Sequence, residues 1–144
     1  PPPVSNWERL IAGGPERWSE FYGDPSADPA EVHRLADHLM EDPDSPERFN
    51  HGVEALWAAA QQDHVPALLA VAALYDPVSD SGPTSAQVEK KPGLAMDHYM
   101  RAKRQGSADA APAIERLCGW LSDQRFTGDG SANRLFSDNC GGRE

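Results

Sequence analysis

Residues 52–75 have the sequence GVEALWAAAQQDHVPALLAVAALY, and this stretch decides the fold. Its apolar residues recur with helical spacing on both sides of a polar break at residues 61–64. Nowhere in the chain do four to eight residues alternate between apolar and polar, as a half-buried strand would. We therefore predict an all-α fold in which this stretch forms two antiparallel helices joined by a tight turn.

The pattern of this stretch returns 43 residues later, at residues 95–118. Most of the matched residues are small or apolar. Antiparallel helices need small residues where their backbones approach and large ones where side chains interdigitate, which is the logic of helical-hairpin repeats. The identical pairs are Ala59 and Ala102, Gln62 and Gln105, Ala67 and Ala110, Ala70 and Ala113, and Leu74 and Leu117.

Proline, glycine and capping residues delimit the other helices. Asp28 followed by Pro29 opens one helix, and Asp42-Pro43 ends it. Ser45 followed by Pro46 opens the next helix in the same way. We predict about five main helices, at residues 29–40, 45–63, 67–75, 92–105 and 107–124.

The segments outside these helices are expected to be irregular. Residues 1–28 are broken by Pro and Gly and hold short helical turns around residues 7–11 and 16–22. Residues 76–91 are rich in Ser, Gly, Pro and Asp, which is typical of a loop. The tail at residues 126–144 has four glycines and no helical period.

The two copies resemble the Sel1-like repeats, relatives of the tetratricopeptide repeats. In that family the first helix carries Ala, an aromatic pair, Ala-Ala and a Gln-Gly turn, and the second carries Ala, Leu-Gly and Tyr. The first copy here keeps Ala59, Ala60, Gln62, Ala67, Leu74 and Tyr75. The second copy keeps Ala95, Tyr99, Ala102, Gln105, Gly106 and Ala110. The resemblance implies an α-α superhelix of antiparallel hairpins.

The sequence departs from the family pattern at several positions. Asp63 stands where the first copy should have the turn glycine, and Lys103 replaces the second Ala of the second copy. Ala72 and Glu115 occupy positions where the family prefers Gly. The period of 43 residues exceeds the usual mid-thirties because the loop between the copies is long.

The resemblance also implies a domain organisation. Two repeats are fewer than the about three that stand alone, so the flanking segments are expected to act as caps. The predicted domains are an irregular segment at residues 1–28 and a helical domain at residues 29–144, divided into a capping helix (29–41), repeat one (46–76), repeat two (92–123) and a tail (124–144).

The net charge of −10 is unevenly distributed along the sequence. Residues 1–50 hold 11 acidic and 4 basic residues, whereas residues 90–104 hold five basic residues and one acid, Asp97. An acidic chain repels phosphate backbones, so we do not expect a nucleic acid partner. We interpret the basic run as a solvated helix face. No apolar run approaches the ~20 residues of a membrane span, so none is predicted.

Motifs for catalysis are missing from the sequence. It has no G-x-S-x-G, no phosphate-binding Gly loop and no H-E-x-x-H. Asp129, Ser131 and Asn133 begin like a calcium loop, but Arg134 and Cys140 stand at its sixth and twelfth positions, where Gly and Glu are required. We predict no enzyme activity and no cofactor.

A metal site is the weaker of two interpretations of residues 33–41. His33, Asp37 and Glu41 are spaced to share one helix face and could hold a metal ion. The family pattern includes no such site, and an apolar stripe runs beside these residues. We therefore favour a polar, solvated face and predict no metal.

The candidate partner-binding residues lie on the first helix of each repeat. The repeat aligns Trp57 with Met100, and Arg101 and Arg104 follow on the second copy. Apolar anchors at equivalent positions could line a concave face that binds a protein or peptide. The alternative is that Trp57 packs on the 29–40 helix. The oligomeric state is left open.

The resemblance implies adaptor, scaffold or regulatory roles, often in bacterial envelopes. We therefore expect a non-catalytic protein-binding module. The alternative is an immunity or inhibitor protein that blocks a secreted or envelope enzyme, because a small acidic protein can mimic or repel a substrate. The acidic residues for that role are Glu41, Asp42, Asp44 and Glu47.

The two cysteines, Cys118 and Cys140, are predicted to form a disulfide. Cys118 lies on the inward stripe of the last predicted helix, and Cys140 lies in the tail. Folding the tail back would cover three apolar residues and bring the cysteines together. These apolar residues are Phe126, Leu135 and Phe136.

A disulfide favours an oxidising compartment, and we expect a bacterial periplasmic or secreted protein. The sequence starts at Pro1 without an initiator Met, which agrees with a removed signal peptide and equally with a trimmed chain. The alternative is a cytoplasmic protein with two free thiols.

Overall fold

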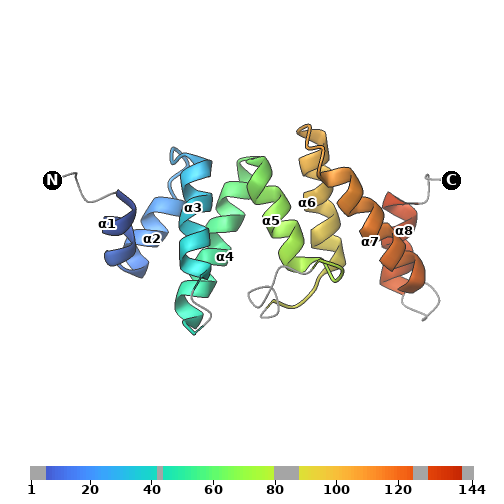
Figure 1. The fold of residues 1–144 in the computed structure, drawn as a ribbon, viewed down its shortest axis with the longest axis horizontal. Helices are drawn as coiled ribbons and strands as arrows, with labels where there is room; N and C mark the ends of the chain where they lie inside the picture. The colour runs from blue at the N-terminus through green and yellow to red at the C-terminus, as the bar shows by residue number, and fades with distance from the viewer. Residues whose placement is uncertain (1–5, 42–43, 80–87, 125–129, 141–144) are drawn as a thin grey trace. The chain divides into compact units, whose positions relative to one another are not determined.

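The computed structural model describes residues 6–41, 44–79, 88–124 and 130–140, and these contain eight helices and no strand. The all-α prediction is therefore confirmed for the described part of the chain (Figure 1). The helices are α1 (Asn6–Ala12), α2 (Pro15–Tyr22), α3 (Pro29–Met40), α4 (Pro46–Gln61), α5 (Val65–Tyr75), α6 (Pro92–Arg104), α7 (Ala110–Gln124) and α8 (Gly130–Asn139).

Side-chain caps explain where α3 and α4 begin. The Asp28 carboxylate accepts a hydrogen bond from the backbone N–H of Ala30 (3.1 Å), and the Ser45 hydroxyl accepts one from that of Arg48 (3.2 Å). A proline follows each cap at the first helical position, where its missing N–H removes no helical bond. The predicted starts of both helices are confirmed.

The contacts divide the chain into two units, residues 1–67 and 68–144. In the first unit α3 packs along α4, α2 packs on both, and α1 contacts α2 and α3. Gly52 of α4 lies against α3, where a Cβ would come 3.1 Å from the Ala36 carbonyl oxygen and would collide with the Met40 side chain. The core of this unit is formed by Trp18, Val32, Leu35, Leu39, Phe49, Leu56 and neighbouring alanines.

In the second unit α7 packs between α6 and α8, and α8 also contacts α6. The backbone N–H of Lys91 bonds to the carbonyl of Tyr75 (2.9 Å), which joins the start of α6 to the end of α5. Its buried core includes Leu68, Val71, Met96, Tyr99, Ile114, Leu117 and Leu121.

The turns that end α4 and α6 have the same hydrogen bonds. The N–H of His64 bonds to the carbonyl of Ala59, and that of Asp63 to Ala60. Forty-three residues later, Ser107 bonds to Ala102 and Gly106 to Lys103. This pair of bonds defines the Schellman helix end. Equivalent backbone hydrogen bonds thus recur 43 residues apart, which is the period of the repeat in the sequence.

The irregular tail and the five-helix count were wrong. Residues 130–139, predicted to be irregular, form α8, whereas the short helical turns expected around residues 7–11 and 16–22 are present as the helices α1 and α2. Ala132, Leu135 and Phe136 have helical spacing, but the glycines and polar residues around them hide it in the sequence. α7 begins at Ala110, so Pro112 lies in its first turn, where its missing N–H removes no helical bond.

No helix in the described ranges is both long and apolar enough to cross a membrane.

Candidate functional site

A mostly apolar groove of about 330 Å³ lies in the second unit, between the start of α6, the end of α7 and one face of α8. Leu121 and Ala132 form its buried floor, and the half-buried Trp120 and Leu135 form its walls. The exposed side chains of Arg134 and Asp138 stand at its rim. A large apolar side chain of a partner would fit such a groove, with polar groups meeting the rim.

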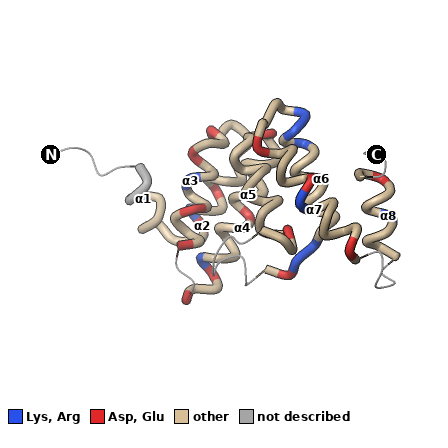
Figure 2. Tube along the Cα trace, turned by 45° about the vertical axis from the view of Figure 1, so that its right-hand side comes forward, with Lys and Arg blue, Asp and Glu red and all other residues tan. Residues whose placement is uncertain are grey.

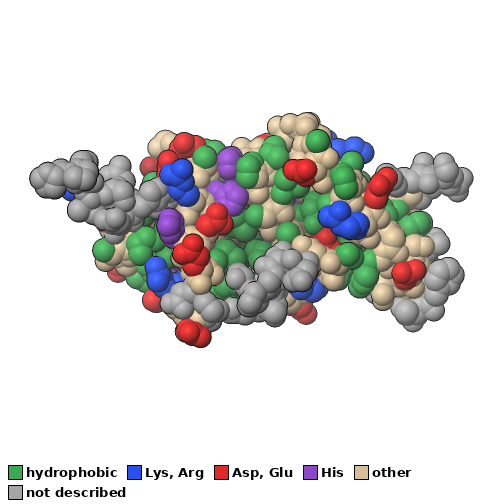
Figure 3. Space-filling model, in the orientation of Figure 1, with side chains coloured by type: hydrophobic (Ala, Val, Ile, Leu, Met, Phe, Trp, Pro, Cys, Tyr) green, Lys and Arg blue, Asp and Glu red, His purple; other side chains and the backbone are tan. Residues whose placement is uncertain are grey.

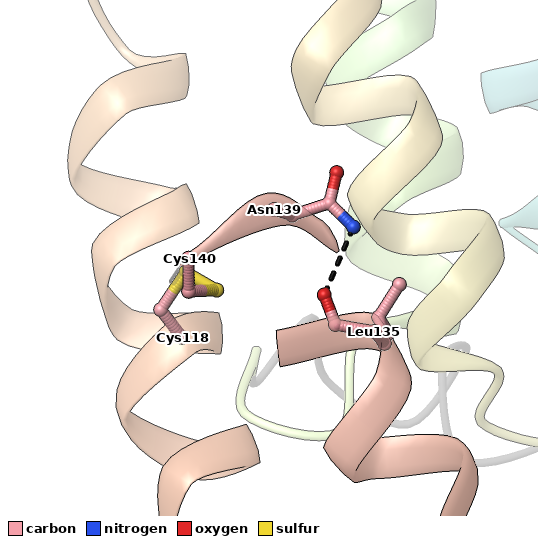
Figure 4. The surroundings of a disulfide bond; sticks show 4 residues. All are labelled: Cys118, Leu135, Asn139 and Cys140. Carbon is pink, nitrogen blue, oxygen red and sulfur yellow. Dashed lines mark hydrogen bonds between the residues drawn. A yellow bond between two sulfur atoms is a disulfide. The ribbon is translucent and has the colours of Figure 1, made fainter. Parts of the chain in front are cut away.

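The wall that α8 contributes to this groove is tied to α7 by the cysteines (Figure 4). The Sγ atoms of Cys118 and Cys140 lie at disulfide distance, and their Cα atoms lie 5.8 Å apart. This arrangement is compatible with the predicted disulfide, and both residues are buried. The end of α8 is further closed by Asn139, whose side-chain N–H donates to the carbonyl of Leu135 at 3.0 Å.

The predicted partner-binding residues lie on two helices. Trp57 is half-buried on α4, in the first unit. Met100 and Arg101 are half-buried and Arg104 is exposed on α6, in the second unit. The basic end of α6 complements the negative end of its helix dipole. That these four residues form one binding surface stays a prediction.

The acidic residues proposed for an inhibitor role run from the end of α3 into the first turn of α4. Glu41, Asp44 and Glu47 are all exposed, and Asp42 lies outside the described residues. The first unit as a whole holds 13 of the 23 acidic residues and 4 of the 13 basic ones. Figure 2 marks the acidic residues along α2, α3 and α4. The negative charge of the protein is therefore concentrated in residues 1–67.

A polar cluster that the sequence did not reveal joins α2 to α4 in the first unit. The Tyr22 hydroxyl donates to Oε2 of Glu54 (2.7 Å) and lies 2.9 Å from Nδ1 of His51. His51 Nδ1 and Glu54 Oε2 are 3.7 Å apart. Burial, together with the Glu54 carboxylate, raises the pKa of the Tyr22 phenol, although the Ser19 hydroxyl opposes this.

Aromatic packing holds the imidazole of this cluster in place. The His51 ring meets the buried Trp18 ring edge-on, with centroids 5.5 Å apart. The Trp18 indole N–H donates to the carbonyls of Leu10 (2.9 Å) and Ile11 (3.2 Å), which anchors α2 to the end of α1. The cluster therefore packs against Trp18 in the core of the first unit.

Histidine side chains also gather over α3 and the end of α4 (Figure 3). The rings of His33 and His64 meet edge-on at 5.6 Å, and His33 Nε2 lies 3.6 Å from the Asp37 carboxylate. Burial lowers the pKa of His64, the charge of a protonated His33 lowers it further, and Asp28 raises it.

Among the described residues, no group of three or more His, Cys, Asp and Glu is placed to hold a metal ion. Glu41, the third residue of the set considered in the sequence, is exposed at the end of α3.

A buried hydrogen bond secures the second unit. The Tyr99 hydroxyl donates to Oδ2 of Asp76 (2.7 Å), and the backbone N–H of Val78 donates to Oδ1 (2.8 Å). Burial raises the pKa of the Tyr99 phenol, and the Asp76 carboxylate raises it further. Asp76 is 1% exposed, so these bonds replace the water that its carboxylate has lost.

Comparison with known proteins found no matching family model, no matching curated protein and no matching solved structure.

Proposed function

We propose that this chain is a non-catalytic protein-binding module of Sel1-like helical repeats that binds a partner protein or peptide through the groove between α6, α7 and α8. The observation that carries the proposal is the apolar lining of this groove, with Trp120 and Leu135 open to a partner side chain. Aromatic and aliphatic residues in a partly enclosed pocket are typical anchors of protein interfaces.

Two further observations support the repeat assignment and the compartment. The turns after α4 and α6 have matching hydrogen bonds 43 residues apart, as successive repeats would. The paired Cys118 and Cys140 favour a periplasmic or secreted protein, because a cytoplasm keeps most thiols reduced.

Site-specific photocrosslinking tests the proposal. A photoreactive amino acid at Arg134, on the groove rim, should crosslink a partner in cells that produce the protein, and mass spectrometry would identify it. The same amino acid at Lys103, exposed on α6 and outside the groove lining, serves as the control. Equal crosslinking from both positions would argue against the groove.

Affinity for the purified partner then decides the role of the groove. Leu135→Asp places a charge on the apolar wall and should weaken binding by at least about tenfold. Asn133→Asp adds the same charge to α8 at an exposed position outside the lining and should leave affinity unchanged. Unchanged affinity of a folded Leu135→Asp variant would exclude the groove as the binding site.

The second candidate function is inhibition of a secreted or envelope enzyme. The exposed Glu41, Asp44 and Glu47 favour this role, because they present negative charge beside the α3–α4 turn. Replacing all three with Gln or Asn should then weaken inhibition of the partner enzyme, whereas Leu135→Asp should not.

A further inference from the structure

We propose that Tyr22, His51 and Glu54 form a binding site for a divalent transition-metal ion, of the zinc or copper type. This site is separate from the proposed groove and lies in the first unit, between α2 and α4. Its ligands would be the phenolic oxygen, the imidazole Nδ1 and one carboxylate oxygen.

The three donor atoms lie close to the spacing that such an ion requires. Their separations are 2.7 Å (Tyr22 to Glu54), 2.9 Å (Tyr22 to His51) and 3.7 Å (His51 to Glu54). Donors about 2.1 Å from a common ion are roughly 3.0 Å apart in octahedral and about 3.4 Å apart in tetrahedral geometry. The observed separations bracket these values, so an ion can meet all three donors with small side-chain movements.

The nature of the donors and the surrounding charge point to the same kind of ion. One nitrogen and two oxygens suit zinc and copper better than calcium, which prefers six to eight oxygens. His51 and Glu54 are three residues apart on α4, so they face the same side of the helix. The first unit holds 13 acidic and 4 basic residues, which attracts cations.

The site is held on one side and open on the other. Trp18 packs against the His51 ring and so fixes the orientation of the imidazole. The Glu54 side chain is 64% exposed, which leaves a path for the ion and room for water ligands. The protein would supply three ligands and solvent the rest.

Binding would release one proton. The metal–oxygen bond forms at the Tyr22 oxygen as its O–H bond breaks, and the proton passes to solvent. The neutral His51 ring binds through Nδ1 with its proton moved to Nε2, so the imidazole itself releases no proton. The hydrogen bond from Tyr22 to Glu54 is lost, and both oxygens then face the ion. Binding should therefore be stronger at higher pH.

Isothermal titration of the full chain with zinc or copper ions alone tests the site. The protein should carry no histidine tag and should keep Cys118 and Cys140 oxidised, so that thiols cannot bind metal. We expect one ion per chain, about one proton released, measured in buffers of different ionisation enthalpy, and a higher melting temperature with metal.

Substitutions of the three ligands test whether they bind the metal ion. Tyr22→Phe should abolish the proton release, and Tyr22→Phe, His51→Ala and Glu54→Gln should each lower affinity about tenfold or more. Glu54 is exposed, so Glu54→Gln tests the site even if the other variants fold poorly. His33→Ala, in the other histidine pair, should bind as the wild type does.

Two results would overturn the proposal. One is an absence of heat and of any melting shift with a large excess of either ion. The other is binding by the wild type that Tyr22→Phe and Glu54→Gln leave unchanged, with the same number of protons released.

Discussion

Asp63 and Gly106 occupy the same position in two helix-ending turns, and both have positive φ, 59° and 94°. This conformation is easy for glycine and strained for a residue with a Cβ, although Asp tolerates it better than most. Gly106 and Asp63 therefore adopt the same left-handed backbone conformation, but the conformational strain is larger at Asp63.

Substitutions at these two positions should have opposite effects. We expect Asp63→Gly to stabilise the protein by up to about 1 kcal/mol and Gly106→Ala to destabilise it by about 1 kcal/mol. No atom lies within 4 Å of a Cβ at Gly106, so the loss would come from backbone strain alone. Urea denaturation measures both free energies of unfolding.

Gly119→Ala is the matched control. Gly119 lies in the middle of α7 with open space around a Cβ, so alanine there should stabilise by about 0.5–1 kcal/mol. If Gly106→Ala also stabilised the protein, the positive φ at residue 106 would be wrong.

Gly52→Ala should destabilise the first unit by about 1–3 kcal/mol, because the new methyl group would collide with Met40 and press on the Ala36 carbonyl. The double variant Gly52→Ala/Met40→Ala should recover part of this loss, since the truncated side chain leaves room. Denaturation of the single and double variants gives the coupling energy. A neutral Gly52→Ala variant would argue against the close packing of α3 on α4.

The sequence predicted those elements whose ends are fixed by interactions between neighbouring residues, and it missed those that depend on contacts with distant helices. The caps Asp28 and Ser45 act within one helical turn, so their identity sufficed. The helix α8 was missed because Gly130, Ser131 and Asn133 have weak helix propensity, and packing on α7 stabilises the helix.

The same distinction applies to the sites. Cys118 and Cys140 could be paired because the sequence offers no other cysteine. The groove could not be predicted from the sequence, since one of its walls belongs to α8, which was not predicted. Tyr22 and His51 are 29 residues apart, and only the packing of α2 on α4 brings them together.

The stability of the protein should fall when His64 becomes protonated. The pKa of His64 lies below its usual value of about 6.5, because burial and the charge of His33 disfavour its cation in the folded state. The stabilisation from neutral His64 is therefore complete above the unfolded pKa and is lost as the pH falls through the folded pKa.

Urea denaturation between about pH 8 and pH 5 measures this dependence. We expect His64→Gln to flatten the part of the profile below about pH 6.5. If His64→Gln kept the full slope, other groups would be responsible for the loss of stability in acid.

Removal of the Cys118–Cys140 link should destabilise the protein and weaken partner binding together. The cysteines are 22 residues apart, and opening a loop of this size lowers stability by about 3 kcal/mol in the chain-entropy model. The double variant Cys118→Ser/Cys140→Ser should therefore unfold at lower urea concentration. Because α8 forms one wall of the groove, the affinity of the double variant for the partner should also fall. The wild type should lose affinity in the same way under reducing conditions.

Asn133→Ala, an exposed change on α8, is the control for both measurements. Intact mass without reductant reports the bond itself, and two thiols free to alkylate in protein from its native compartment would contradict both the pairing and the oxidising environment inferred from it.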